Sequence, residues 1–137
     1  MCEVFPSMFP YIAVAGVAAL SLTSPASSEM LVSYTRSGGF AGVGETVVVH
    51  RDGTVTTGRG RTAEFTLDEA RFRDLRQALD GVTTRTSSRR WCNIPDHFTY
   101  TLAHRGWRAT RCHRLPEDWR PVVTRLEALL RSPARPR

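Results

Sequence analysis

The stretch ETVVVHRDGTVTT, residues 45–57, decides the fold class of this 137-residue chain. Its β-branched residues are typical of strands. The Asp52-Gly53 pair between the two runs is a strong short hairpin signal, because Asp and Gly suit the tight turn that joins antiparallel strands. The stretch therefore predicts two paired strands, over 45–50 and 55–57, and with them an antiparallel sheet.

Upstream, residues 30–36 alternate apolar and polar side chains with the period of a strand, and the connection over 37–44 contains four glycines. We expect a short strand, paired mainly through its N-terminal half. The connection is either a plain hairpin loop with Phe40 folded back on the core, or a recognition loop that presents Phe40 to another surface. A phosphate-binding loop is not expected, because a strand rather than a helix follows the glycines.

Downstream, residues 58–61 loosen the chain before Thr66-Leu67-Asp68-Glu69, which fits a capping box that starts a helix. One apolar stripe at helical spacing is formed by Phe72, Leu75, Leu79 and Val82. Gly81 is expected to cap this helix in a left-handed conformation. Residues 83–90 have no large apolar side chain and predict a solvated loop.

A second hairpin and a second helix follow. Residues 98–103 and 107–111 alternate on either side of His104-Arg105-Gly106, and apolar residues at helical spacing then run from Trp119 to Leu130. Pro121 requires this helix to start near Asp118. The order β-β-β-α-β-β-α predicts an α+β fold, with an antiparallel sheet of about five strands and two amphipathic helices packed on one face.

The N-terminal segment, residues 1–29, is set apart from a single predicted domain over 30–131 and a disordered tail over 132–137. Its apolar run 11–22, followed by Ser24-Pro25-Ala26, is typical of a secretory signal peptide cleaved after Ala26. The alternatives are an uncleaved N-terminal membrane segment and a true start at Met30. The first two predict a secreted or cell-envelope protein, and the third a cytoplasmic one.

Removal of a signal peptide would leave two cysteines, Cys92 and Cys112. An even pair in a short exported chain favours one disulfide, with two reduced thiols as the alternative.

The chemistry-bearing residues form no catalytic pattern. The four histidines, at positions 50, 97, 104 and 113, lack helical i, i+4 pairing, and the chain has neither a Cys-x-x-Cys nor a Gly-x-Ser-x-Gly motif. We expect that the protein is not an enzyme and that it binds neither a metal ion nor a cofactor. The net charge is +6, and every basic residue is an arginine. Codon usage explains this absence of lysine as well as selection for a nucleic-acid surface does, so the charge is weak evidence for nucleic-acid binding. We expect no nucleic-acid partner for an exported chain.

Two motifs resemble a known family. They are LVSYTRSGGFAG, residues 31–42, and PDHFTY, residues 95–100, followed by Leu115-Pro116 and Arg120-Pro121-Val122. Over roughly residues 30 to 131 the chain resembles emfourin, the protealysin inhibitor family, and its actinobacterial relatives.

The resemblance implies a sheet-and-helix protein inhibitor that occupies the cleft of thermolysin-like metallopeptidases. The segment offered to the protease would be Ser37, Gly38, Gly39, Phe40 and Ala41. The partner would then be a protein, a metallopeptidase, and the oligomeric state is not indicated. The predicted signal, the predicted disulfide and the arginine-rich residues 85–90 depart from the family pattern.

The alternative function is a non-catalytic cell-envelope module. Its basic face would bind acidic polymers or lipid headgroups. Apart from such headgroup binding, we expect contact with a membrane only if the N-terminal segment is uncleaved.

Overall fold

The computed structural model describes residues 29–132. The predicted signal or membrane segment, apart from Glu29, and the predicted tail, apart from Ser132, lie outside the described residues. The elements are β1 (Met30–Gly38), β2 (Val43–His50), β3 (Thr54–Arg59), β4 (Arg61–Thr66), α1 (Glu69–Asp80), β5 (Phe98–His104), β6 (Trp107–Cys112), a 3-10 turn (Glu117–Trp119) and α2 (Arg120–Arg131). The fold is α+β, as predicted. In this part of the chain neither helix is long and apolar enough to cross a membrane.

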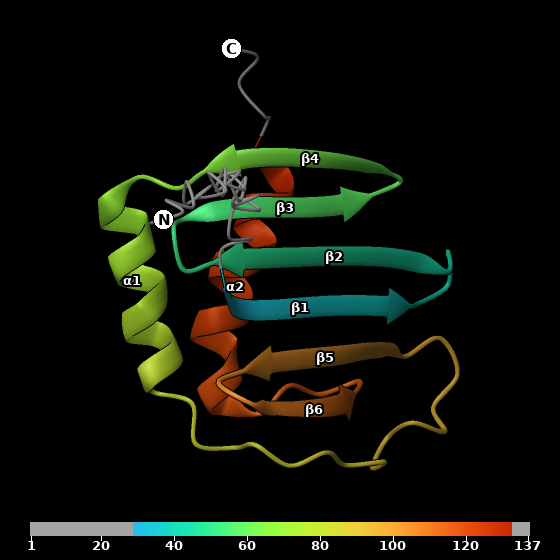
Figure 1. The fold of residues 1–137 in the computed structure, drawn as a ribbon. Coiled ribbons are helices and arrows are strands. Elements are labelled where there is room, and N and C mark those ends of the chain that lie inside the picture. Colours follow the sequence, from blue (N-terminus) through green and yellow to red (C-terminus); the bar gives the residue numbers. More distant parts are fainter. Residues whose placement is uncertain (1–28, 133–137) are drawn as a thin grey trace, which may run out of the picture.

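The strands form one antiparallel sheet in the order β4-β3-β2-β1-β5-β6 (Figure 1). β1 lies inside this sheet and is paired on both sides, with β2 from Met30 to Gly38 and with β5 from Val32 to Gly38. The prediction that this strand pairs mainly through its N-terminal half is therefore wrong. Pairing continues into the glycines because both neighbours extend as far as β1 does.

The sheet has six strands rather than about five. The missed strand is β4, which pairs with β3 from Thr54–Thr66 to Arg59–Arg61 around a turn at Gly60, whose φ is +70°. β4 is an edge strand in which Ala63 and Phe65 are partly buried and the other four residues are exposed. An edge strand with so few apolar residues has a weak period in the sequence.

The first helix starts later than predicted, because Thr66 belongs to β4. The N-cap is Asp68, whose carboxylate accepts a hydrogen bond from the Arg71 N–H at 2.8 Å. The capping box at Thr66 and Glu69 is therefore wrong. The left-handed cap at Gly81 is also wrong, since its φ of −81° and ψ of −6° are right-handed and the helix ends in a tightened turn.

The core lies on one face of the sheet, against which both helices bury their apolar stripes; α2 crosses behind the strands in Figure 1. The largest fully buried aliphatic and aromatic side chains are Trp119, Tyr34, Leu75, Leu102, Leu126, Val32, Val47, Val49, Val55 and Val122. Burial of each aliphatic side chain contributes about 1.5–3 kcal/mol to the stability of the fold, and burial of each aromatic one contributes at least as much. The predicted stripe of α1 is confirmed at Leu75, Leu79 and Val82.

Three local predictions are confirmed. The Asp52-Gly53 turn joins β2 to β3, with a Gly53 φ of +88°. The hairpin at Arg105-Gly106 joins β5 to β6. Pro121 lies in the first turn of α2, where its missing N–H costs no helical hydrogen bond.

The connection from α1 to β5, residues 81–97, contains no helix or strand but is held by side chains from elsewhere. One Asp118 oxygen accepts from the backbone N–H groups of Thr83 and Thr84 at 2.8 and 2.7 Å, and the Trp119 indole donates to the Thr84 carbonyl at 2.8 Å. Further along, the Ser88 N–H donates to the carbonyl oxygen of Thr110 in β6 at 3.1 Å. The predicted solvated loop is thus largely exposed, but it runs along the edge of the sheet.

Candidate functional site

The predicted protease-binding residues lie together at the β1–β2 hairpin. Ser37 and Gly38 end β1, and Gly39 and Phe40 belong with Ala41 to the turn that leads into β2. The turn is closed by a hydrogen bond from the Gly42 N–H to the Gly39 carbonyl at 3.2 Å. We call residues 39–42 the hairpin tip.

Glycine is required where the tip meets β5. Gly38 and Gly39 have φ values of +98° and +75°, and a Cβ on Gly38 would lie 2.6 Å from the His97 carbonyl oxygen. A Cβ on Gly39 would lie 2.7 Å from the Phe98 ring, and the Gly39 N–H donates to the His97 carbonyl at 3.0 Å. The base of the tip is therefore clamped against the start of β5, in a backbone conformation that residues other than glycine rarely adopt.

Phe40 is the most exposed large apolar residue that the structure describes, with 94% of its surface accessible. This exposure excludes the arrangement in which Phe40 folds back on the core. An exposed phenyl ring leaves unused apolar area that a partner can bury. The neighbouring residues Gly39, Ala41 and Gly42 are small, so another surface can approach the ring closely.

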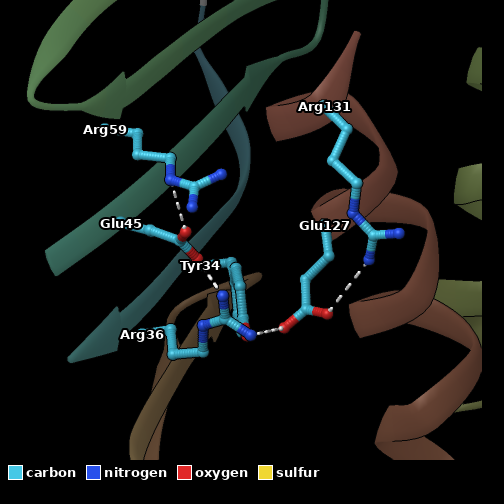
Figure 2. A network of polar contacts seen from close by, with 6 residues as sticks. All are labelled: Tyr34, Arg36, Glu45, Arg59, Glu127 and Arg131. Carbon is cyan, nitrogen blue, oxygen red and sulfur yellow. Dashed lines mark hydrogen bonds and ion pairs between the residues drawn. The ribbon is translucent and has the colours of Figure 1, made fainter. Parts of the chain in front are cut away.

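An ion-pair network at the root of the hairpin connects it to the neighbouring strand (Figure 2). Its centre is Glu45, which is 2% exposed and contacts Arg36 Nη2 at 2.5 Å and Arg59 Nε at 3.1 Å. A buried carboxylate requires such partners, because it has lost its hydration. Glu45 thus ties β1, β2 and β3 together at the end of the sheet that carries the tip.

Arg36 extends the network to α2. Its Nη1 donates to a Glu127 carboxylate oxygen at 3.0 Å, and the Tyr34 hydroxyl donates to the same oxygen at 2.8 Å. Burial, and then the bond to Glu127, raise the pKa of Tyr34 far above its ordinary value. Burial acts to lower the pKa of Arg36, but the charges of Glu127 and Glu45 outweigh it and raise that pKa, so the guanidinium stays charged. Its carbon lies 5.0 Å from the centre of the Phe98 ring, next to the clamp.

This network was not predicted from the sequence. One signal was available: Glu45 occupies the same alternation as Val47 and Val49, so a strand reading places its carboxylate on the core side. The partners Arg36 and Glu127 are 91 residues apart, and no spacing rule connects them.

The predicted disulfide is present between Cys92 and Cys112, with their Cα atoms 5.0 Å apart. It attaches the long connection to the end of β6. Nearby, the His113 N–H donates to the Phe98 carbonyl at 2.8 Å, so this attachment lies beside the strand that clamps the tip.

The histidines do not gather into a site. His97 and His104 each place Nδ1 2.7 Å from a backbone carbonyl oxygen, whereas His50 ends β2 and His113 follows β6. Within residues 29–132, no three His, Cys, Asp or Glu side chains are grouped as they would be around a metal ion.

Comparisons of the chain with protein-family models, with curated proteins and with solved structures found no match.

Proposed function

We propose that this chain is a small exported protein inhibitor of thermolysin-like metallopeptidases, similar to emfourin, and that the hairpin tip enters the cleft of the enzyme. The observation that carries the proposal is Phe40, 94% exposed at the end of a hairpin whose base is clamped. A large aromatic side chain that fills a partner's apolar pocket is typical of the residues that dominate binding energy.

The rigidity of the hairpin supports this role. The tip is fixed by the Gly39–His97 hydrogen bond at 3.0 Å, and the strands beneath it by the buried Glu45 with its two arginines. A loop held in its binding conformation before association loses less conformational entropy on binding than a free loop does.

The backbone of the tip supports inhibition rather than cleavage. Peptides bound as an added strand are extended, with negative φ values. Gly39 and Gly42 have φ values of +75° and +61°, so the tip turns away from an extended path on both sides of Phe40. In this proposal the tip occupies the cleft without placing an extended peptide along it.

The test is a titration of a thermolysin-like peptidase at low nanomolar concentration with the purified protein. We expect stoichiometric inhibition. Phe40→Ala should raise the inhibition constant about thirtyfold or more, which corresponds to a hot-spot loss of about 2 kcal/mol. The thermal midpoint should hardly change, because the ring has no buried contacts to lose.

Met30→Ala is the matched control, since Met30 is the other exposed large apolar residue of the described chain, at 44%. This variant should inhibit like the wild type. Absence of inhibition by the folded protein across several such peptidases would overturn the proposal, and so would an unchanged inhibition constant for Phe40→Ala.

A further inference from the structure

A groove of about 440 Å³ lies between the 81–97 connection and the end of β6. Three of its lining residues are arginines, Arg90, Arg111 and Arg114, and none is acidic. Trp91 and Ser88 also line it. We call this feature the arginine groove.

Two of the arginines are held by one aromatic ring. The guanidinium carbons of Arg90 and Arg114 lie 5.1 and 4.9 Å from the centre of the Trp91 ring. A cation–π contact of this kind does not use a hydrogen bond of the guanidinium, so its N–H groups stay available to an acceptor. Trp91 has a left-handed φ of +72°, so the chain turns sharply where it presents the ring.

The third arginine is held by the backbone of the connection. Arg111 donates from Nε and Nη2 to the Thr86 carbonyl oxygen at 2.9 and 2.6 Å. Among residues 29–132, none of the three arginines forms an ion pair with a carboxylate. Other arginines of the sheet, such as Arg36 and Arg59, do form such pairs.

Three cations lining one groove without a carboxylate repel one another, and a bound anion removes that repulsion. The Cys92–Cys112 disulfide holds the two halves of the groove together, since Cys92 follows Trp91 and Cys112 follows Arg111. The fold thus keeps the charges close together although they repel.

We propose that the arginine groove binds a phosphate group. The guanidinium fork matches the spacing of phosphate oxygens, and two or three positioned arginines are a common phosphate-binding arrangement. The source is either a free phosphate or a phospholipid headgroup. This inference does not depend on peptidase inhibition, because Phe40 is not part of the groove.

The first arm of the test uses inorganic phosphate. The full chain, labelled with ¹⁵N, is titrated with sodium phosphate while sodium chloride keeps the ionic strength constant, and the indole N–H signal of Trp91, assigned with Trp91→Phe, is followed. The second arm measures co-sedimentation with phosphatidylglycerol vesicles and with phosphatidylcholine vesicles.

The variant is the double substitution Arg90→Gln with Arg114→Gln. The matched control is Arg73→Gln with Arg108→Gln, which removes the same charge from exposed positions on α1 and β6 that do not line the groove. We expect the groove variant to bind about tenfold more weakly or worse and the control to change by less than about twofold.

Saturable binding of inorganic phosphate that the groove variant loses supports a free-phosphate site. Binding to phosphatidylglycerol vesicles that the same variant loses supports a headgroup site. Two results overturn the proposal: neither probe binds saturably, or the groove variant and the control lose binding equally, which would mean that net charge alone attracts the anion.

Discussion

The hairpin tip and the 81–97 connection meet where Gly39 contacts His97, but they are held in different ways. The tip is a short turn fixed by its own glycines and by two backbone hydrogen bonds, one within it from Gly42 to Gly39 and one from Gly39 to His97. The connection is fixed by Asp118, Trp119 and Cys112, whose side chains come from elements that follow it in the chain. The turn of the tip is therefore set by local backbone geometry and anchored by a backbone contact outside it, whereas the connection depends on side chains from several later elements.

This difference separates two kinds of damage. A substitution in the tip should change binding to a partner more than it changes stability. A substitution in the supports of the connection should lower stability and disturb the arginine groove, while a folded molecule keeps its tip.

The largest expected effect is loss of the disulfide. Cys92→Ser with Cys112→Ser removes a cross-link between residues separated by 20 positions, and should lower the free energy of unfolding by about 3 kcal/mol through the greater freedom of the unfolded chain. Urea denaturation followed by circular dichroism measures this loss. The folded variant should still inhibit a peptidase at low temperature but bind phosphate weakly.

Treating the wild type with a reductant should reproduce the stability loss of the double variant. If the variant instead loses peptidase inhibition while keeping phosphate binding, the comparison between the two segments is wrong.

Gly38→Ala should have the next largest effect. Its φ is +98° and the added Cβ would lie 2.6 Å from the His97 carbonyl oxygen, so either β5 shifts or the hairpin opens. We expect a loss of about 2 kcal/mol in the free energy of unfolding, together with weaker inhibition. Thermal and urea unfolding measure the first effect, and enzyme titration the second.

Gly42→Ala is the matched control for this clash. Its φ is +61°, but no heavy atom lies within 4 Å of the added Cβ. Backbone strain alone should then cost about 1 kcal/mol. Equal losses for the two variants would show that contact with β5 does not constrain the base of the tip.

The smallest expected effect concerns Asp118 and is pH-dependent. Burial acts to raise the pKa of Asp118, but hydrogen bonds from Thr84 and Thr83 outweigh it and hold the pKa below the ordinary value. A carboxyl with a lower pKa in the folded state stabilises the fold above the unfolded pKa of about 4, and this contribution is lost as the pH falls through the folded-state value.

We therefore expect Asp118→Asn to be less stable than the wild type by about 1 kcal/mol at neutral pH, with a difference that shrinks below about pH 4. Urea unfolding across this pH range measures it. Asp80→Asn is the control, because Asp80 is 67% exposed and lies 4.0 Å from its nearest cation, Arg105. A difference at Asp118 that is the same at pH 7 and pH 3 would contradict a role for its charge.

Much of the fold could be predicted from local patterns. Asp52-Gly53 predicted its hairpin, Pro121 the start of the last helix, and the spacing of Leu75 and Leu79 the buried stripe. β4 could not be predicted, because its pairing with β3 supplies the hydrogen bonds that its weak period does not suggest. With that strand in place, the helix start moved from Thr66 to Asp68.

The candidate site, too, could be predicted from the sequence only in part. The glycines around Phe40 predicted a loop with positive φ values, but the sequence left open whether the ring folds inward or outward. In the structure the ring is exposed, and the base of the tip is held by His97 and Phe98, which lie far along the chain. The arginine groove was even less predictable, since Arg90 and Arg114 come together only after the connection is attached to β6.

The sequence by itself determined the α+β class, the two hairpin turns, the helical stripes and the glycines of the tip, because these depend on backbone preferences and on the period of apolar residues over a few neighbours. The tertiary structure alone decided the outward position of Phe40, the partners of the buried Glu45 and the gathering of three arginines in one groove. Burial, ion pairing and the clustering of charges depend on what surrounds a side chain, and those surroundings are created by segments brought together only when the chain folds.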